Sequence, residues 1–376
     1  MLKAVKYRIY PTDEQAELFS RTFGCCRKIW NLMLSDKNDH YALTGKMLHN
    51  TPAQYKDEYP YLREVDSLAL ANVQLQLQTA YKSFFSGNAD FPKYKSRKRS
   101  RRSYTTNNQK GTILVTDNSI RLPKIGAIKA SIHRKLNGTI RSATVSRNHC
   151  MQYFCSVLYE IPDKHVNYQI DTDNAVGLDY KSDGLSVSSD DKICGSPKYY
   201  RLMERKLARA ERRLSKKRGY RKNESPSNNF YKQKLRIAKI HQHITDQRLG
   251  FLHKESLHLA EQYDLVCIED LDMKAVSNKG FHNGKATLDN GYGMFTKMLA
   301  YKLHDRGKQL VVIDRWFPSS QICHTCGYRN PITKDLKIRT VACPVCHKVY
   351  DRDYNAALNI RDEGIRQYLS GLQAVS

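Results

Sequence analysis

The first hundred residues change from an alternating pattern to a helical one. Residues 2–9 alternate between apolar and polar side chains well enough to predict a strand, which stops before Pro11. Thr12, followed three residues later by Gln15, has the spacing of a helix capping box. Apolar side chains then recur at helical intervals, so residues 12–90 are predicted to be mostly helical.

Short alternating runs return over residues 112–160. Apolar and polar side chains exchange places along 128–133, for example, and turn residues such as Asn137-Gly138 separate the runs. Many short strands at regular spacing favour an antiparallel barrel or sandwich. Together with strand 2–9 they predict one β-rich body into which the helical segment is inserted.

Beyond a polar linker at 163–174, strands and helices alternate. The apolar runs predict strands at 175–180, 185–189, 265–268 and 310–313. Helical spacing predicts long helices from residue 201 onward, one helix near 291–306 and a last one from Asp353. Strands followed by strand–helix–strand units are typical of an α/β core.

The composition limits the class of protein. The chain has 376 residues, which corresponds to two or three domains at about 100–200 residues each. No apolar run approaches the roughly 20 residues of a membrane helix, and no signal peptide follows Met1, which excludes membrane and secreted proteins. The ten cysteines are therefore not interpreted as a disulfide framework, and the six that lie outside paired spacing are expected to be reduced core residues of a cytosolic protein.

The chain carries a formal net charge of +26, which favours a polyanionic partner and nucleic acid above all. Residues 93–102 are mostly Lys and Arg, with Phe91, Tyr94 and Tyr104 interleaved or adjacent. Rings can stack on bases while the cations neutralise phosphates. Residues 201–222 form a second basic segment. The alternative is that both segments are only solvated surface.

Four cysteines give the strongest single signal. Cys323-x-x-Cys326 and Cys343-x-x-Cys346 are two paired turns of the kind that hold tetrahedral zinc. His324 is adjacent to a ligand, but four thiolates already close the site. A closed site is structural, so zinc is expected to hold a loop that has no core of its own.

Three carboxylates lie at predicted element ends. Asp179 lies in an apolar strand, Glu269 ends another, and Asp353 starts the last helix. A buried acid needs a partner, and a divalent cation is a suitable one. Each acid alone could be a strand-end acid, a helix cap or a solvated turn, and Asp353 in particular could be an N-cap. The three together in a basic α/β region predict metal-dependent phosphodiester cleavage.

These residues resemble a known family. The strings that match are Gly177-Leu178-Asp179, Ile268-Glu269-Asp270-Leu271 and the run from Asp351 to Ile360, with Phe317 to Gly327 before the cysteines and Tyr7 to Thr12 at the start. They are similar to the three RuvC-type motifs, the zinc-ribbon approach and the N-terminal segment of the TnpB proteins of transposons, which are related to type V CRISPR effectors. The resemblance spans nearly the whole chain in the family's order.

The resemblance implies an α+β multidomain protein. An antiparallel β-barrel, the wedge domain, would comprise residues 1–11 and 105–165, with a helical recognition lobe at 12–104 inserted. An RNase H-like, RuvC-type α/β nuclease domain would comprise 170–322 and 351–376, with a zinc ribbon at 323–350 inserted.

The resemblance also implies an activity. The chain would be an RNA-guided DNA endonuclease that cleaves double-stranded DNA beside a short motif read by the protein itself. Asp179, Glu269 and Asp353 would hold catalytic magnesium, and the partners would be guide RNA and target DNA, with no membrane and no small-molecule substrate. The expected location is the prokaryotic cytosol or nucleoid.

Two details of the match stay open, and so do two alternative activities. Lys181 stands where the family often has a glycine after the first acid, and Asp351 is a second candidate acid in the third motif. The alternatives are a guided DNA-binding repressor that has lost cleavage, and a transposase that joins DNA strands with the same acids.

Overall fold

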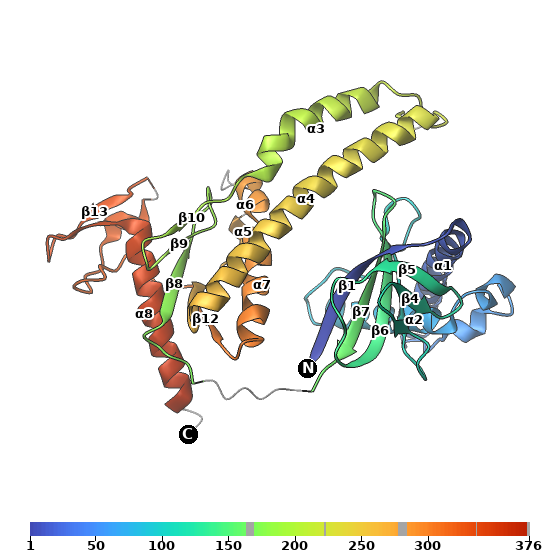
Figure 1. Cartoon of the computed structure of the whole chain (residues 1–376), viewed down its shortest axis with the longest axis horizontal. Helices are drawn as coiled ribbons and strands as arrows, with labels where there is room; N and C mark the ends of the chain where they lie inside the picture. Colours follow the sequence, from blue (N-terminus) through green and yellow to red (C-terminus); the bar gives the residue numbers. More distant parts are fainter. Residues whose placement is uncertain (163–168, 222, 277–283, 336, 374–376) are drawn as a thin grey trace. The chain divides into compact units, whose positions relative to one another are not determined.

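The chain forms two compact units in the computed structural model, which describes residues 1–162, 169–221, 223–276, 284–335 and 337–373 (Figure 1). The units are Met1–Lys164 and His165–Ser376, and each has its own architecture. Part of the predicted linker, residues 163–168, and Lys222 of the second basic segment lie outside the described residues. Among the helices described, none combines the length and hydrophobicity needed to cross a membrane.

The first unit is built on a seven-stranded antiparallel sheet in the order β2-β6-β7-β1-β5-β4-β3. The strands are β1 (Leu2–Tyr10), β2 (Arg102–Asn107), β3 (Leu114–Val115), β4 (Ser119–Leu122), β5 (Gly126–Ser131), β6 (Thr139–Arg147) and β7 (Tyr153–Glu160). Buried and partly exposed residues alternate strictly along β7, as the sequence pattern predicted. The described pairings leave β2 and β3 at the two edges, so closure into a barrel stays a prediction.

Helices are inserted into this unit between β1 and β2. They are α1 (Asp13–Thr44), α2 (Ser67–Phe85) and two 3₁₀ turns (Pro52–Tyr55 and Pro60–Arg63). The capping box is confirmed: the Gln15 amide donates to the Thr12 hydroxyl at 3.3 Å, and the Thr12 amide donates to the Gln15 side chain at 3.1 Å. The Phe19 ring of α1 lies 5.6 Å from the Tyr153 ring of β7, so helices and sheet share one core.

The second unit contains a mixed five-stranded sheet in the order β10-β9-β8-β11-β12. Its strands are β8 (Ala175–Tyr180), β9 (Ser186–Ser188), β10 (Ile193–Cys194), β11 (Leu265–Glu269) and β12 (Gln309–Ile313). Strand β9 is antiparallel to both of its neighbours, β8 and β10, whereas β8, β11 and β12 are parallel. The first four residues of β11 are all buried, which is expected of a parallel strand covered on both faces.

Six helices, two of them short, are described in this unit. They are α3 (Tyr199–Ser215), α4 (Asn228–Gln262), α5 (Met273–Val276), α6 (Gly284–Asn290), α7 (Tyr292–His304) and α8 (Arg352–Gln373). Figure 1 shows α3 and α4 as a projecting helical hairpin. A narrow apolar seam, with Leu207 and Ala210 facing Ile240 and Ile244, joins the two helices. The basic side chains of α3 are therefore left mostly in solvent.

A small β-ribbon lies between β12 and α8 along the chain. It contains a 3₁₀ turn (Pro331–Lys334) and the antiparallel strands β13 (Thr340–Ala342) and β14 (Val349–Asp351). Helix α8 begins at the residue after β14 and then packs on strands β8 and β11. The start of α8 is thus placed beside both the ribbon and the sheet.

Two glycines allow α8 to lie very close to the sheet. A Cβ atom on Gly177 of β8 would be 2.1 Å from the Ala357 carbonyl oxygen and 2.6 Å from the Arg361 amide nitrogen. A Cβ atom on Gly364 of α8 would be 2.2 Å from the Cys267 sulfur. Because real atoms do not approach this closely, any larger residue at either position must push the helix away.

We expect Gly177→Ala to destabilise the second unit, because the added methyl group would meet helix backbone that cannot move aside. Overpacking of this kind costs about 1–3 kcal/mol. Gly250→Ala is the matched control, because Gly250 lies in helix α4 with no atom close to its added Cβ. That change should be neutral or slightly stabilising. Thermal unfolding of both variants tests this, and equal melting temperatures would contradict the close crossing.

Candidate functional site

Asp179 and Glu269 meet at one edge of the second sheet. Leu178 of β8 is in register with Ile268 of β11, so the acids that follow them stand side by side at the ends of parallel strands. Both are partly buried. Burial raises the pKa of Asp179 well above its usual range, and the charges of Glu269 and Asp353 raise it further, against an opposing effect of Arg352. The three predicted carboxylates therefore form one electrostatically coupled group.

Glu269 has a defined hydrogen-bond partner. Burial raises its pKa, and a hydrogen bond donated by the Ser319 hydroxyl to a Glu269 oxygen opposes that rise. Ser319 is itself buried and lies between β12 and the ribbon. Its hydroxyl therefore fixes the orientation of one carboxylate oxygen at the site.

Tyr292 adds a hydrogen-bond donor near the two strand-end acids. It is buried, and its hydroxyl has no hydrogen-bond partner among the described residues. Burial raises its pKa, and the charges of Asp179 and Glu269 raise it further; Tyr292 and Glu269 also line the same pocket. An unpaired buried hydroxyl at this point can serve a ligand that enters between the acids.

Asp353 is buried at the start of α8 and is held by two arginines. Arg339 of the ribbon reaches both of its oxygens, at 3.0 and 2.8 Å, and Arg352 reaches one at 3.1 Å. The helix cap is Asp351, whose Oδ1 accepts from the amides of Asp353 and Tyr354 at 2.9 Å each. Asp351, and not Asp353, therefore caps the helix, so the N-cap alternative for Asp353 is wrong.

Asp179 and Glu269 offer the kind of oxygen donors that a divalent cation takes. Two partly buried carboxylates that repel each other are relieved by a cation between them, and oxygen ligands are those that magnesium prefers. Asp353 would have to exchange Arg339 for the cation. Arg339 can leave without a large desolvation cost, because its side chain is 56% exposed.

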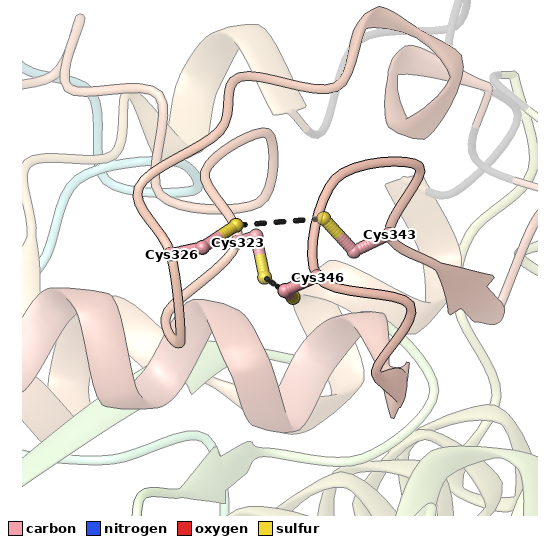
Figure 2. Close-up of side chains that lie close together, drawn as sticks. All are labelled: Cys323, Cys326, Cys343 and Cys346. Atoms are coloured by element: carbon pink, nitrogen blue, oxygen red, sulfur yellow. Dashed lines mark hydrogen bonds between the residues drawn. The ribbon is translucent and has the colours of Figure 1, made fainter.

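The four cysteines of the ribbon form a compact cluster. Figure 2 shows two facing loops, with Cys326 opposite Cys343 and Cys323 opposite Cys346. These sulfur pairs are 3.5 and 3.7 Å apart, and all four sulfurs lie within 4.8 Å of one another. Four sulfurs around zinc at about 2.3 Å would be about 3.8 Å apart, so the cluster fits zinc.

Local contacts support thiolate ligands in this cluster. Backbone amides, chiefly that of Cys346, lower the pKa of the Cys343 thiol to about 6, whereas burial and hydrogen bonds to the other cysteines raise that of Cys326. His324 points elsewhere, with its Nε2 2.7 Å from Asp362 on α8. Within the described parts of the chain, the four cysteines are the only group of three or more potential ligand residues drawn together this tightly.

The basic segment 93–102 is fixed to the first unit and is not a free linker. The Asn31 side chain bonds both the amide and the carbonyl of Lys95, at 2.8 and 2.9 Å, and the Trp30 ring donates to the Lys93 carbonyl at 3.1 Å. The Lys95 ammonium lies 3.5 Å from the centre of the Trp30 ring, and burial lowers its pKa to about 8. Five further cations remain exposed around this anchor: Lys93, Arg97, Lys98, Arg99 and Arg101.

Sequence reasoning did not assign roles to Ser319, Tyr292 or Arg339. Ser319 stands in a string that was noted for its resemblance, but its partner Glu269 is 50 residues earlier. Arg339 and Tyr292 have no local signal, because only the return of the ribbon and of α7 to the sheet edge brings them to the acids.

Family models match three parts of the chain. A model described as "Helix-turn-helix domain" matches residues 1–46, one described as "Probable transposase" matches 156–279, and "Cas12f1-like, TNB domain" matches 292–360. Residues 1–46, all of them described, form strand β1 and the single helix α1, so the first match reflects sequence and not a helix–turn–helix geometry.

Relatives match almost the whole chain. A protein of Streptomyces pristinaespiralis named "Putative RNA-guided DNA endonuclease" is 35% identical over 380 residues, which cover 96% of this chain and 89% of that protein. The InsQ protein of Escherichia coli K12, which bears the same description, is 28% identical over 96% of this chain and 92% of its own length.

A solved structure shares the fold. The protein in a Cas12f1–sgRNA–target DNA complex matches 96% of this chain and 98% of its own with a TM-score of 0.60, at 14% identity. The mixed sheet with strand-end acids and the four-cysteine ribbon thus define a transposase-related protein of the Cas12f1-like fold. On its similarity to the Streptomyces protein, the chain belongs to the TnpB family.

We expect the purified chain to contain about one zinc ion, held by Cys323, Cys326, Cys343 and Cys346. Cys326→Ser should lower the zinc content and the yield of folded protein, because the ribbon has little core to replace the metal. Cys150→Ser, outside the cluster, is the control. Elemental analysis measures the zinc, and a metal-free wild-type protein purified without chelator would reject the site.

We expect Asp179→Asn to raise the melting temperature at pH 7 in buffer without magnesium. The folded state resists ionisation of Asp179, whereas the unfolded state ionises freely above pH of about 3.9, so folding is penalised as the pH rises above that value. The gain should reach roughly 2–4 °C, which is about 1 kcal/mol for a unit of this size, and should vanish below pH of about 4.

Asp183→Asn, at an exposed turn after the same strand, is the control and should not show this pH dependence. Magnesium should narrow the difference between Asp179→Asn and wild type, because only the wild type gains a full ligand set. A pH-independent difference in melting temperature would argue against carboxylate repulsion as its cause.

Proposed function

We propose that this chain is an RNA-guided DNA endonuclease of a transposable element, which cleaves double-stranded DNA by magnesium-dependent hydrolysis beside a short motif that it reads. The observation that carries the proposal is the placement of Asp179 and Glu269 near the ends of two neighbouring parallel strands, with Asp353 at the start of the helix that packs on both strands. The names of the two relatives, each matching nearly its full length, support the guided cleavage of DNA.

The three carboxylates would hold the metal ions. When bound, magnesium stabilises the charge on the attacking and leaving oxygens of the phosphodiester. Ser319 orients Glu269, and the buried Tyr292 hydroxyl is available to a ligand between the acids. Arg339, released from Asp353, would be able to pair with a phosphate oxygen, since its side chain is more than half exposed.

Two exposed basic surfaces would hold the nucleic acids. Helix α3 and the turn after it carry exposed cations along one side of the hairpin: Arg201, Arg205, Lys206, Arg209, Arg212, Arg213, Lys216, Lys217, Arg218 and Arg221. The anchored segment 93–102 is the second surface. Contacts of this kind bind phosphates regardless of sequence, so target choice would come from base pairing with the guide RNA.

The finer domain assignment is part of this proposal. Three antiparallel strands followed by two parallel ones, with α8 packed across them, support an RNase H-like, RuvC-type domain over 170–322 and 351–376. The antiparallel sheet supports a wedge domain over 1–11 and 105–165, with 12–104 as the helical lobe and 323–350 as the ribbon.

We expect Asp179→Ala to abolish cutting of a plasmid by the protein–RNA complex while guided DNA binding is kept. Cutting needs the metal ligands, whereas affinity comes from phosphate contacts and base pairing. Glu269→Gln and Asp353→Ala should behave in the same way. EDTA should abolish wild-type cutting. Plasmid cleavage and a gel-shift assay on the same complexes measure the two properties.

Asp351→Ala is the matched control for the third acid. It removes a helix cap, at a cost of about 0.5–2 kcal/mol in stability, but should retain cutting at a temperature where the variant is folded. Full cutting by Asp179→Ala would reject the metal mechanism. If the wild-type complex bound the guided target but did not cut it, the result would favour a repressor. If it joined DNA ends, the result would favour a transposase.

A further inference from the structure

Helix α8 presents different side chains to the sheet and to the ribbon. Ala356, Ala357 and Ile360 are buried, with Ile360 in the apolar core of the sheet. Another stripe of the helix, at positions three and four residues apart, carries Asn355, Asn359 and Asp362, and all three contact segment 319–324. The sheet and the ribbon approach are thus held by separate faces of one helix.

The two asparagines satisfy the backbone of that segment. The Asn355 amide group donates to the Ile322 carbonyl at 2.7 Å, and its oxygen accepts from the His324 amide at 2.9 Å. The Asn359 amide group donates to the carbonyls of Ser319 and Ile322, at 2.7 Å each. Both asparagines are buried, so these bonds are made out of reach of bulk water and define one position for the segment.

Segment 319–324 joins the zinc cluster to the carboxylates. Its first residue, Ser319, donates to Glu269, and Cys323 near its end belongs to the sulfur cluster. The other side of the ribbon makes a second connection, because Arg339 pairs with Asp353 and the Arg352 amide donates to the Arg339 carbonyl at 2.8 Å. The ribbon, through Arg339, and the segment that leads into it, through Ser319, therefore contact two of the three acids.

We propose that Asn355 and Asn359 form a latch through which the zinc-loaded ribbon holds Glu269 and Asp353 in position to bind a divalent cation. This inference rests on the proposed metal site, and it makes both asparagines positioning residues that touch neither metal nor DNA. Ile360 packs into the core of the sheet from another face of α8, so loss of the asparagines should disturb the metal site before it unfolds the unit.

The test measures binding of Mn²⁺ to the zinc-loaded full-length chain without nucleic acid, from the EPR signal of free Mn²⁺. Asn359→Ala and Ser319→Ala should each weaken the Asp179-dependent site about 10–100-fold, the usual effect of losing a residue that orients a metal ligand. Ser319→Thr, which keeps the hydroxyl, should restore most of the affinity. Ser370→Ala, at an exposed position of the same helix, should leave it unchanged.

Zinc removal then tests the coupling. Cys326→Ser should weaken Mn²⁺ binding in the wild-type background. It should weaken it little further in Asn359→Ala, because the hydrogen bonds that link the ribbon approach to α8 are already lost there. Equal losses in the two backgrounds would overturn the latch. If Asn359→Ala does not fold, Ser319→Ala decides, since it removes one hydroxyl only, and unchanged Mn²⁺ affinity in it would overturn the proposal.

The proposed function fails in a different way. If Asp179→Ala bound as much Mn²⁺ as the wild type, the proposed metal site would be wrong, and the latch with it. If the wild type bound Mn²⁺ but the latch variants did so equally well, the latch alone would be wrong.

Discussion

The close crossing of α8 over the second sheet is the constraint on which the site depends. Asp353 lies at the start of this helix, whereas Asp179 and Glu269 lie at strand ends, so the helix must approach the sheet for the three charges to interact. Gly177 and Gly364 make that approach possible, because side chains there would collide with Ala357, Arg361 and Cys267. Two glycines, which have no reactive side chains, thus determine where the carboxylates lie.

Like charges at the sheet edge are the cost of this arrangement. Burial and mutual repulsion raise the pKa of Asp179, and burial raises that of Glu269. Arg339 and Arg352 neutralise Asp353, and Ser319 supplies a hydrogen bond to Glu269. In the proposed metal site, Ser319 would keep its hydrogen bond to Glu269, whereas Arg339 would give up Asp353 to the cation.

The ribbon shows how a segment without its own core is kept in a defined place. Few of its residues are buried, and its strands β13 and β14 have three residues each. Four cysteines hold it from within, and the buried amides of Asn355 and Asn359 fasten its approach to α8. Because both fix its position, the ribbon brings Arg339 to Asp353, and the segment that leads into it brings Ser319 to Glu269.

Local patterns in the sequence determined much of this protein. Alternation and helical spacing predicted most of the strands and helices but not β2, β13 or β14. The capping box at Thr12 marked the start of α1, and the paired cysteines predicted the cluster, because each of these signals depends on residues close in the chain. The three acids were found from their places at element ends and from the family resemblance.

Only the tertiary structure decided which groups the acids meet. It made Asp351 the helix cap, paired Asp353 with Arg339 and Arg352, brought Ser319 to Glu269 across 50 residues, and placed Tyr292 in the same pocket as Glu269. Such pairings depend on how α7, α8 and the ribbon return to one sheet edge. No local pattern encodes them, because the partners are far apart in the chain and each is ordinary in its own neighbourhood.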